Sequence, residues 1–535
     1  MFFQKLKENK YAVIFLAIML VAIFLRTYEF HDWLKFTHDQ ARDAQIVSDI
    51  LSGKQPLPLL GPKAGGTDFL LGPAYYYFSY VAAKIFGNHP DKLAYPSLFF
   101  SILAIPLLFL FMREYFDKRI SLLAIAIMSV SYFFVANSRF SWNPNLLPFF
   151  SLLYLYAILK ILNAKNSSAL WWSVLAGVSL GIGIQLHTFF LVIMPVLTFC
   201  VFGYLFFQKY PSIWKKLFTI LVVTLVLNGT QIISEIKTDW QNTQNFLQGT
   251  SNKSKNNFDD SVLWVAACQI QVNTYFLSSL QDIPPLSDKY ACKNILNAPS
   301  KKFIKSLPYY SSLAASTIFS LLGYFLLWHF LRKEKDEKKK NFLRLVGLFN
   351  LIAFLVFIPV ANVLFLGYFI MLLPVPFVLF GLFLKMLSEK YGRRGELIGI
   401  LLTVALIIAG FARDYEAVKE YNRGARNNSK ETTLENIESI SQYILSNSGD
   451  FHEPYFYGKG WLGGRFSTPL KYFIQEAGKD IKLVWSLDDD EIEPGIPLFY
   501  VKDSSKEIIP GEEADGRKIV SGKRFQRQVI LILEN

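Results

Sequence analysis

The sequence predicts an all-helical protein that crosses a membrane many times and carries a small C-terminal α/β domain outside it. Of its 535 residues, 52% are hydrophobic and 18% are charged, and the mean hydropathy is +0.29. Soluble domains are more charged, at about 25%. The apolar residues also lie in long uninterrupted blocks, with short basic runs between them. A bilayer core about 30 Å thick requires roughly 20 apolar residues per helix, which many of these blocks approach or reach.

About eleven blocks are long enough to span, judged by the length expected of a membrane helix. The first block follows three lysines, lacks a small-residue cleavage site and ends at Arg26, so we expect a retained helix that Arg26 anchors at the interface. The blocks are Tyr11–Leu25, Leu93–Met112, Ile120–Ala136, Pro144–Leu159, Leu170–Leu186, Thr188–Phe207, Leu217–Ile233, Tyr310–Trp328, Leu345–Ala361, Leu364–Leu384 and Leu397–Ala412.

One further block, Gly72–Gly87, is short, contains Lys84 and is rich in tyrosine. If the N-terminus is cytoplasmic and this block does not cross, every short basic loop falls on the cytoplasmic side, as the positive-inside rule requires. If the block crosses, all of these loops move outside. We therefore predict an interfacial helix here, with Asn88, His89 and Lys92 on the outer side.

This topology divides the chain into a transmembrane module, 1–412, and an outer domain, 413–535. The module has two long outer loops, 26–92 and 234–309. In the outer domain the pattern predicts a helix near Leu434–Leu445 and strands at Tyr455–Tyr457, Ile481–Trp485, Leu498–Val501 and Val529–Leu533.

The three cysteines do not have metal-site spacing. Cys268 and Cys292 both fall in the second outer loop, where a disulfide persists. They form either a bridge or two packed thiols. Cys200 lies in an apolar block, so we expect a free, buried thiol there.

Composition and charge also exclude some functions. The net charge of +13 arises from basic runs between apolar blocks, without an aromatic-interleaved basic patch, so we expect no nucleic-acid binding. The apolar blocks contain no carboxylate or histidine near their middle, which counts against a transport path through the membrane. An active site is therefore expected at the outer membrane surface.

The densest polar cluster is Thr37–Asp43, early in the first outer loop. If a helix begins near Asp39, Asp43 lies one turn further on, with Arg42 between them in sequence. A carboxylate at a helix N-terminus is stabilised in its charged form. The pattern fits either a catalytic cluster or a capped amphipathic helix on the membrane surface.

Several motifs together resemble the protein O-mannosyltransferase and aminoarabinose-transferase family, glycosyltransferase family 39 of the GT-C superfamily. The resemblance covers roughly the first half of the chain and does not reach the C-terminal domain. The motifs are Phe24–Arg26, Asp39–Ala44, Leu71–Tyr77, Ser138–Asn145 and Gln185–Thr188, with a weaker continuation from Gly367 to Pro374.

The resemblance implies a polyprenyl-phosphate sugar donor, a hydroxyl acceptor on a lipid, glycan or protein, and inversion at the sugar. It assigns the role of catalytic base, or its support, to Asp39. Many members have Asp-Glu where this chain has Asp39-Gln40, so the second carboxylate is missing, and Asp43 or Asp68 is the candidate to replace it. A divalent metal is compatible with the resemblance, but no ligand cluster in the sequence demands one.

Arg139 and His187 fall in short outer turns, close to where a lipid phosphate would lie. Arginine binds phosphate well because its planar fork donates to two oxygens. Arg139 could equally be a snorkelling side chain, and His187 a polar residue of a tight turn. The substrate-binding candidates are Arg42, Asp68, Tyr75, Arg139, Asn143 and His187.

The sequence thus predicts a plasma-membrane glycosyltransferase with a cytoplasmic N-terminus and its C-terminal domain outside. Two alternatives belong to other classes. A lipid-linked-sugar flippase would share the donor but break no bond. A non-catalytic cell-envelope scaffold would use the outer domain to bind a cell-wall polymer.

Overall fold

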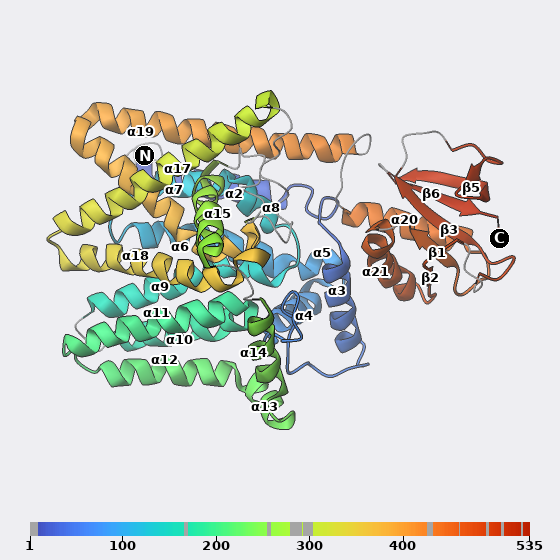
Figure 1. Ribbon diagram of the computed structural model, residues 1–535, viewed down its shortest axis with the longest axis horizontal. Coiled ribbons are helices and arrows are strands. Elements are labelled where there is room, and N and C mark those ends of the chain that lie inside the picture. The colour runs from blue at the N-terminus through green and yellow to red at the C-terminus, as the bar shows by residue number, and fades with distance from the viewer. Residues whose placement is uncertain are drawn as a thin grey trace.

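The computed structural model describes residues 9–164, 169–253, 258–278, 292, 303–424, 432–458, 461–487, 492–503, 508–525 and 528–534. Figure 1 shows a bundle of long helices and a C-terminal domain containing a β-sheet, with α3, α4 and α5 between them. The predicted fold class is confirmed.

Among the described residues, seven helical segments are long and apolar enough to span a membrane, or up to eight if one bent pair counts as a single span. The predicted apolar blocks fall on helical segments, although Ile120–Ala136 and Leu217–Ile233 are each divided between two helices. Helix α19, which turns at Gly392 (φ 54°), contains all of Leu397–Ala412 but only the second half of Leu364–Leu384. The main helices at these blocks are α2 (Lys10–Thr27), α6 (Tyr95–Met112), α7 (Lys118–Val130), α9 (Leu147–Asn163), α10 (Ala169–Leu186), α11 (Thr188–Phe207), α12 (Ile213–Leu227), α17 (Phe303–Lys333), α18 (Glu337–Phe357) and α19 (Pro374–Gly424).

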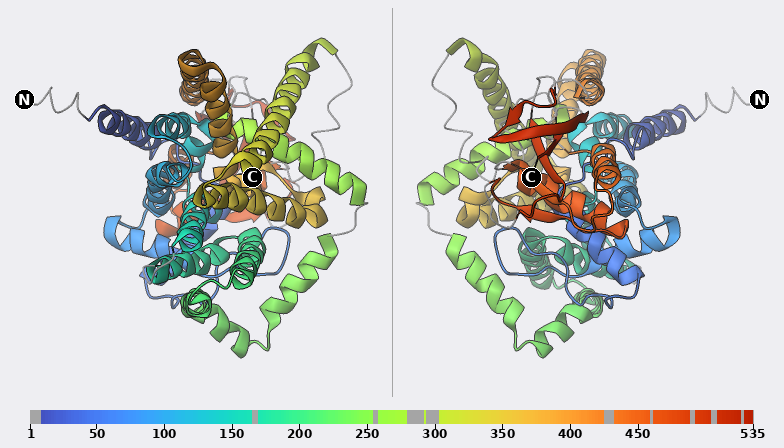
Figure 2. Two further views of the ribbon diagram at one scale, coloured as in Figure 1. Left: turned by 90° about the vertical axis from the view of Figure 1, so that its left-hand side faces the viewer. Right: turned by 90° about the vertical axis from the view of Figure 1, so that its right-hand side faces the viewer.

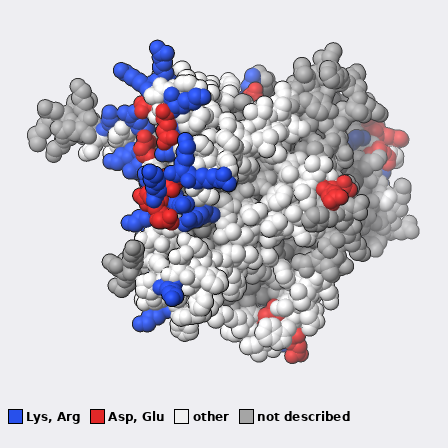
Figure 3. All heavy atoms as spheres, turned by 60° about the vertical axis from the view of Figure 1, so that its left-hand side comes forward, with Lys and Arg blue, Asp and Glu red and all other residues white. Residues whose placement is uncertain are grey.

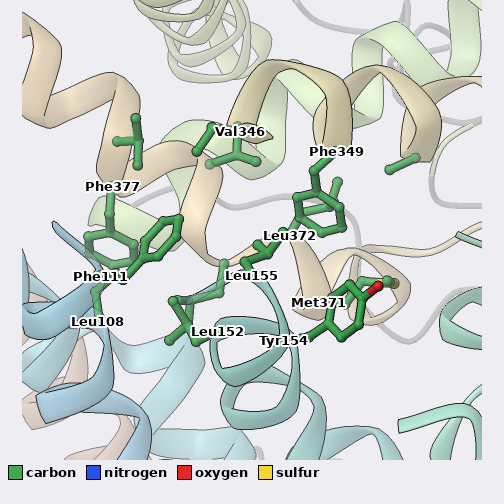
Figure 4. Close-up of a cluster of buried hydrophobic side chains, with 14 of the residues drawn as sticks. Leu108, Phe111, Leu152, Tyr154, Leu155, Val346, Phe349, Met371, Leu372 and Phe377 are labelled. Carbon is green, nitrogen blue, oxygen red and sulfur yellow. The ribbon is translucent and has the colours of Figure 1, made fainter. Parts of the chain in front are cut away.

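Large apolar side chains fill the centre of the bundle. Figure 4 shows Leu108 and Phe111 of α6, Leu152 of α9, Phe349 of α18 and Phe377 of α19 converging there, and all five are fully buried. Because lipid tails are as apolar as these side chains, close packing rather than escape from water holds such helices together.

Arg26, at the end of α2, is also fully buried, so the prediction of an interfacial anchor is wrong. Its guanidinium donates to Ser101 Oγ (3.1 Å) and to the carbonyl oxygens of Ser129 (2.8 Å) and Met128 (3.3 Å). Helix α7 ends at Val130, and its last carbonyls lack partners within the helix. Arg26 supplies the missing donors, which the sequence alone did not indicate.

Charged side chains are unevenly distributed over the bundle. Figure 3 shows lysines and arginines gathered at one end, beside a broad uncharged face. Helix α4 (Ala74–Phe86) lies at the opposite end in Figure 1. It has 13 residues, too few for a spanning helix. The length of α4 agrees with the predicted interfacial helix, and the cytoplasmic side of the basic end stays a prediction.

We expect a cysteine in place of Asn88, an exposed residue just after α4, to react with a membrane-impermeant maleimide in intact cells. The background is Cys200→Ser, and Lys335→Cys in the exposed turn after α17 is the matched control that should react only after permeabilisation. The reverse pattern would mean either that the block at α4 crosses the membrane or that the N-terminus lies outside.

The C-terminal domain contains a six-stranded sheet in the order β2-β1-β3-β6-β5-β4, with β1 parallel to both neighbours and the other pairs antiparallel. Viewed from the right-hand side of Figure 1, its strands lie in front of the helices (Figure 2). The elements are α20 (Leu434–Asn447), β1 (Tyr455–Gly458), α21 (Trp461–Glu476), β2 (Lys482–Val484), β3 (Leu498–Asp503), β4 (Glu513–Ala514), β5 (Arg517–Phe525) and β6 (Gln528–Leu533).

The predicted helix corresponds to α20, and the four predicted strands correspond to β1, β2, β3 and β6. Sequence reasoning missed α21 and β5. Strand β5 has basic residues in pairs near both ends and Ser521-Gly522 in its middle, which weakens the hydrophobic signal of a strand. Helix α19 continues to Gly424, beyond the predicted domain boundary at residue 413.

The first outer loop and the C-terminal domain share one core. Phe36 N donates to Thr432 O (3.1 Å), and Leu434 N donates to Leu34 O (2.8 Å). Helix α21 packs against α3 (His38–Leu51), and Ser48 Oγ of α3 donates to Glu476 Oε1 (2.6 Å). The domain is therefore attached directly to the segment that carries Asp39.

The predicted second outer loop, 234–309, is largely helical where the structure describes it. Besides the end of α13 (Gly229–Lys237), it contains α14 (Gln241–Lys253) and α15 (Phe258–Ser278), and α15 lies across the bundle in Figure 1. Sequence reasoning missed α15 because buried glutamines and an asparagine interrupt its apolar face. Asn273 Nδ2, for example, donates to Ser320 Oγ (3.1 Å) and Tyr324 Oη (3.1 Å) on α17.

A disulfide joins Cys268 of α15 to Cys292, so the predicted bridge is confirmed. Cys200 is free, as predicted. It is exposed, however, because α11 turns that face away from the bundle, so the prediction of a buried thiol is wrong.

Candidate active site

Helix α3 places the acidic cluster at the end of the bundle that adjoins the C-terminal domain. Thr37 precedes the helix, and its backbone N–H donates to Gln40 Oε1 (3.2 Å), as in a capping box. The other end of the Gln40 amide, Nε2, donates to Ser141 O (3.0 Å). Gln40 stands where the resemblance implies a glutamate. In this chain it fixes the start of α3 against the segment that contains Ser141.

Arg42 joins both carboxylates of the cluster. Its Nη1 donates to Asp39 Oδ1 (3.0 Å), while Nε (2.9 Å) and Nη2 (2.7 Å) both donate to Asp43 Oδ1. The two acids differ in access to solvent, since the side chain of Asp39 is 53% exposed and that of Asp43 is 5% exposed. Asp39 can meet a substrate, whereas Asp43 is the buried partner that holds Arg42.

The environment of Asp43 changes its protonation. Burial raises its pKa from 3.8 to about 6, against the opposing effect of Arg42, which stabilises the carboxylate by charge and hydrogen bonding. Tyr76 Oη also donates to Asp43 Oδ1 (3.1 Å). Burial, together with the Asp43 charge, raises the pKa of Tyr76 well above its usual value, so Tyr76 remains a donor. At neutral pH, Asp43 is therefore ionised and bound to Arg42.

A second layer of hydrogen bonds supports this cluster. Ser141 Oγ donates to Leu93 O (3.0 Å), so it accepts the hydrogen bond from Tyr75 Oη at 2.6 Å. Burial and the charge of Asp43 raise the pKa of Tyr75 well above its usual value, which keeps the hydroxyl protonated. The predicted substrate-binding residue Tyr75 is therefore buried and bound to Ser141.

His187 and Asn143 lie just before neighbouring helices, His187 before α11 and Asn143 in the turn that leads into α9. His187 is the N-cap of α11, and its Nδ1 accepts a hydrogen bond from Phe189 N (3.1 Å). An accepting Nδ1 carries no proton, so the neutral ring holds its proton on Nε2. The ring packs edge-on against Tyr368, with centroids 5.2 Å apart. Asn143 Nδ2 donates to Leu186 O (2.6 Å), which ties its turn to the end of α10.

The loop between α3 and α4 folds close to His187. A Cβ atom on Gly65 would lie 3.6 Å from the hydroxyl of Tyr368, the ring that packs on His187. At Gly72 a Cβ would lie only 2.3 Å from Gln185 Cγ, so this close approach requires glycine. Gln185 Oε1 accepts from Ala74 N (3.1 Å), the first residue of α4. This loop thus lies over the turn where α10 ends and α11 begins.

The remaining predicted residues lie in different settings. Asp68 is 80% exposed and pairs with Lys63 (3.0 Å). Arg139 is buried, donates to the carbonyl oxygens of Leu25 (3.2 Å) and Glu29 (2.8 Å), and stacks over two aromatic rings. Its role in phosphate binding stays a prediction. A hollow of about 450 Å³ between α15, α17 and α19 is lined by none of the predicted site residues.

Sequence reasoning missed Tyr76, Ser141 and Tyr368 as parts of this arrangement. Each stands inside a motif that carried the family resemblance. The signal was therefore present, but only the fold shows that Tyr76 contacts Asp43 and that Ser141 contacts Tyr75.

Comparison with known proteins gives two findings. Residues 71–232 match the family model described as dolichyl-phosphate-mannose-protein mannosyltransferase. The apo structure of ArnT from Cupriavidus metallidurans has 11% sequence identity and a TM-score of 0.54, with 98% of each chain covered. The structure of the same protein bound to undecaprenyl phosphate has 13% identity and a TM-score of 0.56, again with 98% of each chain covered. No curated protein sequence matches the chain.

At identities this low, the structural matches establish the fold, and the family model independently matches the segment from α4 to α13. The chain is therefore a multi-pass membrane protein with a fold like that of ArnT. Within that class it is similar to the protein O-mannosyltransferases and ArnT, which confirms the resemblance predicted from the sequence.

Proposed function

We propose that this protein is a glycosyltransferase that takes a sugar from a polyprenyl-phosphate donor and transfers it to an acceptor hydroxyl at the outer face of the plasma membrane. One observation carries the proposal. A half-exposed carboxylate, Asp39, lies at the start of α3 and is oriented by Arg42, in a fold that binds undecaprenyl phosphate in ArnT.

Asp39 is the base in this proposal. Arg42 binds Asp39 Oδ1, so we assign the acceptor proton to Oδ2. As the proton moves to Asp39, the acceptor oxygen forms a bond to the anomeric carbon of the sugar, and the bond from that carbon to the phosphate oxygen breaks. The polyprenyl phosphate leaves with the electron pair. A single displacement of this kind inverts the anomeric centre, and general-base catalysis contributes typically about 10²- to 10⁴-fold.

The leaving phosphate needs donors that stabilise its charge. His187 offers an Nε2–H group at the N-terminus of α11, where the helix dipole favours an anion. Arg42 offers a cation beside the base, and Asn143 and Tyr75 hold the neighbouring turns in place. Arg139 and Asp68 remain candidates for substrate binding from the sequence, and Asp43 acts through Arg42.

The deciding experiment incubates the purified protein with a panel of polyprenyl-phosphate sugars and a membrane extract as acceptor source. Release of free polyprenyl phosphate with one donor would support the proposal. A flippase would move the intact donor across a vesicle membrane without releasing it. A scaffold would do neither, so either of these outcomes would overturn the proposal.

The protonation of Asp43 leads to a pH prediction. Below about pH 6, Asp43 becomes protonated and loosens its hold on Arg42, so kcat/KM should fall on the acid side with an apparent pKa near 6. The hydrogen bond from Tyr76 lowers the pKa of Asp43, so Tyr76→Phe should shift this acid limb to higher pH. Tyr77→Phe is the control, since Tyr77 Oη donates to Pro58 O (2.9 Å) instead. If Tyr76→Phe does not change the apparent pKa of the acid limb, the group that titrates there is not Asp43.

A further inference from the structure

Two histidines and a glutamate from three separate segments meet where the first outer loop contacts the C-terminal domain. His31 lies in the turn after α2, and His89 is the N-cap residue of α5 (Pro90–Leu93). Glu438 is in α20 of the C-terminal domain, 407 residues after His31. One possible ligand atom from each residue lies within 4.8 Å of the other two.

The same nitrogen of each imidazole ring, Nε2, points to the glutamate. His31 Nε2 lies 3.1 Å from Glu438 Oε2, and His89 Nε2 lies 3.0 Å from Glu438 Oε1. The two rings are stacked, with centroids 5.3 Å apart and planes inclined by 25°. In a tetrahedral zinc site with bonds near 2.0–2.1 Å, neighbouring ligand atoms are about 3.4 Å apart. Each Nε2 atom therefore lies near this separation from one glutamate oxygen, and one ligand atom from each residue lies within 4.8 Å of the others.

A buried carboxylate orients the opposite nitrogen of each ring. Asp91 Oδ1 lies 2.8 Å from His89 Nδ1, and Asp91 Oδ2 lies 3.6 Å from His31 Nδ1. Lys92 Nζ donates to Asp91 Oδ2 (2.7 Å) and helps to hold this carboxylate. Histidines that bind metals usually donate their second N–H to such a carboxylate, which leaves the lone pair of the first nitrogen for the metal. The arrangement of Asp91 thus favours the Nε2 atoms as ligands.

The charges point to a cation as well. Asp91 and Glu438 together place two carboxylates around the two stacked imidazole rings. A divalent ion bound by the two imidazoles and Glu438 would be matched by this negative charge. The three side chains are 40%, 37% and 21% exposed, so a metal can enter and water can complete its coordination.

We propose that His31, His89 and Glu438 bind a divalent transition-metal ion, with Zn²⁺ as the best match to imidazole and carboxylate ligands. The ion joins the first outer loop to α20, next to the backbone bridge between Lys35 and Thr433. Its role is structural. It fixes the C-terminal domain on the loop that carries α3, and the proposal holds whatever reaction α3 supports.

The test uses the full chain, purified in detergent and stripped with a chelator. Titration with ZnCl₂ against a chromophoric chelator should give one equivalent bound per chain, and CoCl₂ should give a visible absorption band of a low-coordinate site. Glu438→Gln removes a ligand at nearly constant shape. Glu435→Gln, at an exposed position one turn earlier in α20, is the matched control.

Loss of a carboxylate that only orients a ligating histidine typically weakens binding about 10- to 100-fold, which is the effect expected of Asp91→Asn. Glu438→Gln should weaken binding at least as strongly as the upper end of that range, about 100-fold. Zinc should also raise the melting temperature of the wild type and of Glu435→Gln, but not that of Glu438→Gln. Absence of stoichiometric zinc in the wild type, or equal zinc affinity in Glu438→Gln, would overturn the proposal. If a variant fails to fold, the zinc titration of the wild-type protein still tests whether the metal site exists.

Discussion

Asp39→Asn should reduce sugar transfer by about 10²- to 10⁴-fold, the usual loss when a general base is removed. The substitution keeps the shape of the side chain but removes the negative charge that accepts the proton. Because Asp39 is half-exposed, folding and membrane insertion should be unchanged. The measurement is the initial rate of polyprenyl-phosphate release at saturating donor.

Asp49→Asn is the matched control for this variant. Asp49 lies on the same helix and accepts a hydrogen bond from Gln45 Nε2 (3.0 Å), outside the cluster around Arg42. It should keep nearly the wild-type rate. Near wild-type turnover in Asp39→Asn would instead move the base to Asp43 or Asp68, and the corresponding asparagine variants would show which of the two it is.

Arg42→Gln should have the second large effect, on stability as well as on activity. It leaves Asp43 buried without its cation, and breaking a buried pair from one side typically destabilises a protein by about 3–5 kcal/mol. We expect the lower end, about 3 kcal/mol, because the Arg42 side chain is 35% exposed and solvent screens part of the interaction. Thermal denaturation in detergent measures the loss. Lys54→Gln, which removes a 72% exposed lysine near the end of α3, should change little.

The pH dependence of this loss has a definite sign. Arg42 stabilises the ionised form of Asp43, whose pKa is about 6 with Arg42 present. The destabilisation by Arg42→Gln should therefore be large at pH 8 and small at pH 5, where Asp43 is protonated in both proteins. Adding Asp43→Asn to Arg42→Gln should restore most of the stability at pH 8, because no buried charge remains, but not the activity. If the double variant is no more stable than Arg42→Gln, the cluster does not act as a charge pair.

The sequence predicted the membrane bundle well because spanning helices leave a strong local signal. Long apolar blocks such as Thr188–Phe207 have few other structural solutions, since backbone groups in lipid must be satisfied within the helix. Helix α15 was not predicted because Gln269 and Asn273 interrupt its apolar pattern. Their partners lie on α17 and α18, and no local pattern shows such pairing.

The acidic cluster was also visible locally, because Asp39, Arg42 and Asp43 lie within one and a half turns of a single helix. The burial of Asp43 was not, since it depends on Tyr76 and on the packing of α3 against α4. For Arg26 and Arg139 the sequence could not distinguish an interfacial side chain from a buried one. Both donate to backbone carbonyls of distant segments or turns.

By itself, then, the sequence determined the membrane-spanning architecture, the family resemblance and the position of the candidate base, because each depends on residues close together in the chain. The tertiary structure alone decided which carboxylate is buried, how the C-terminal domain packs on the first outer loop, and that His31, His89 and Glu438 meet. These features join residues from well-separated segments of the chain, and side-chain packing and charge pairing between such segments leave no periodic trace in a sequence.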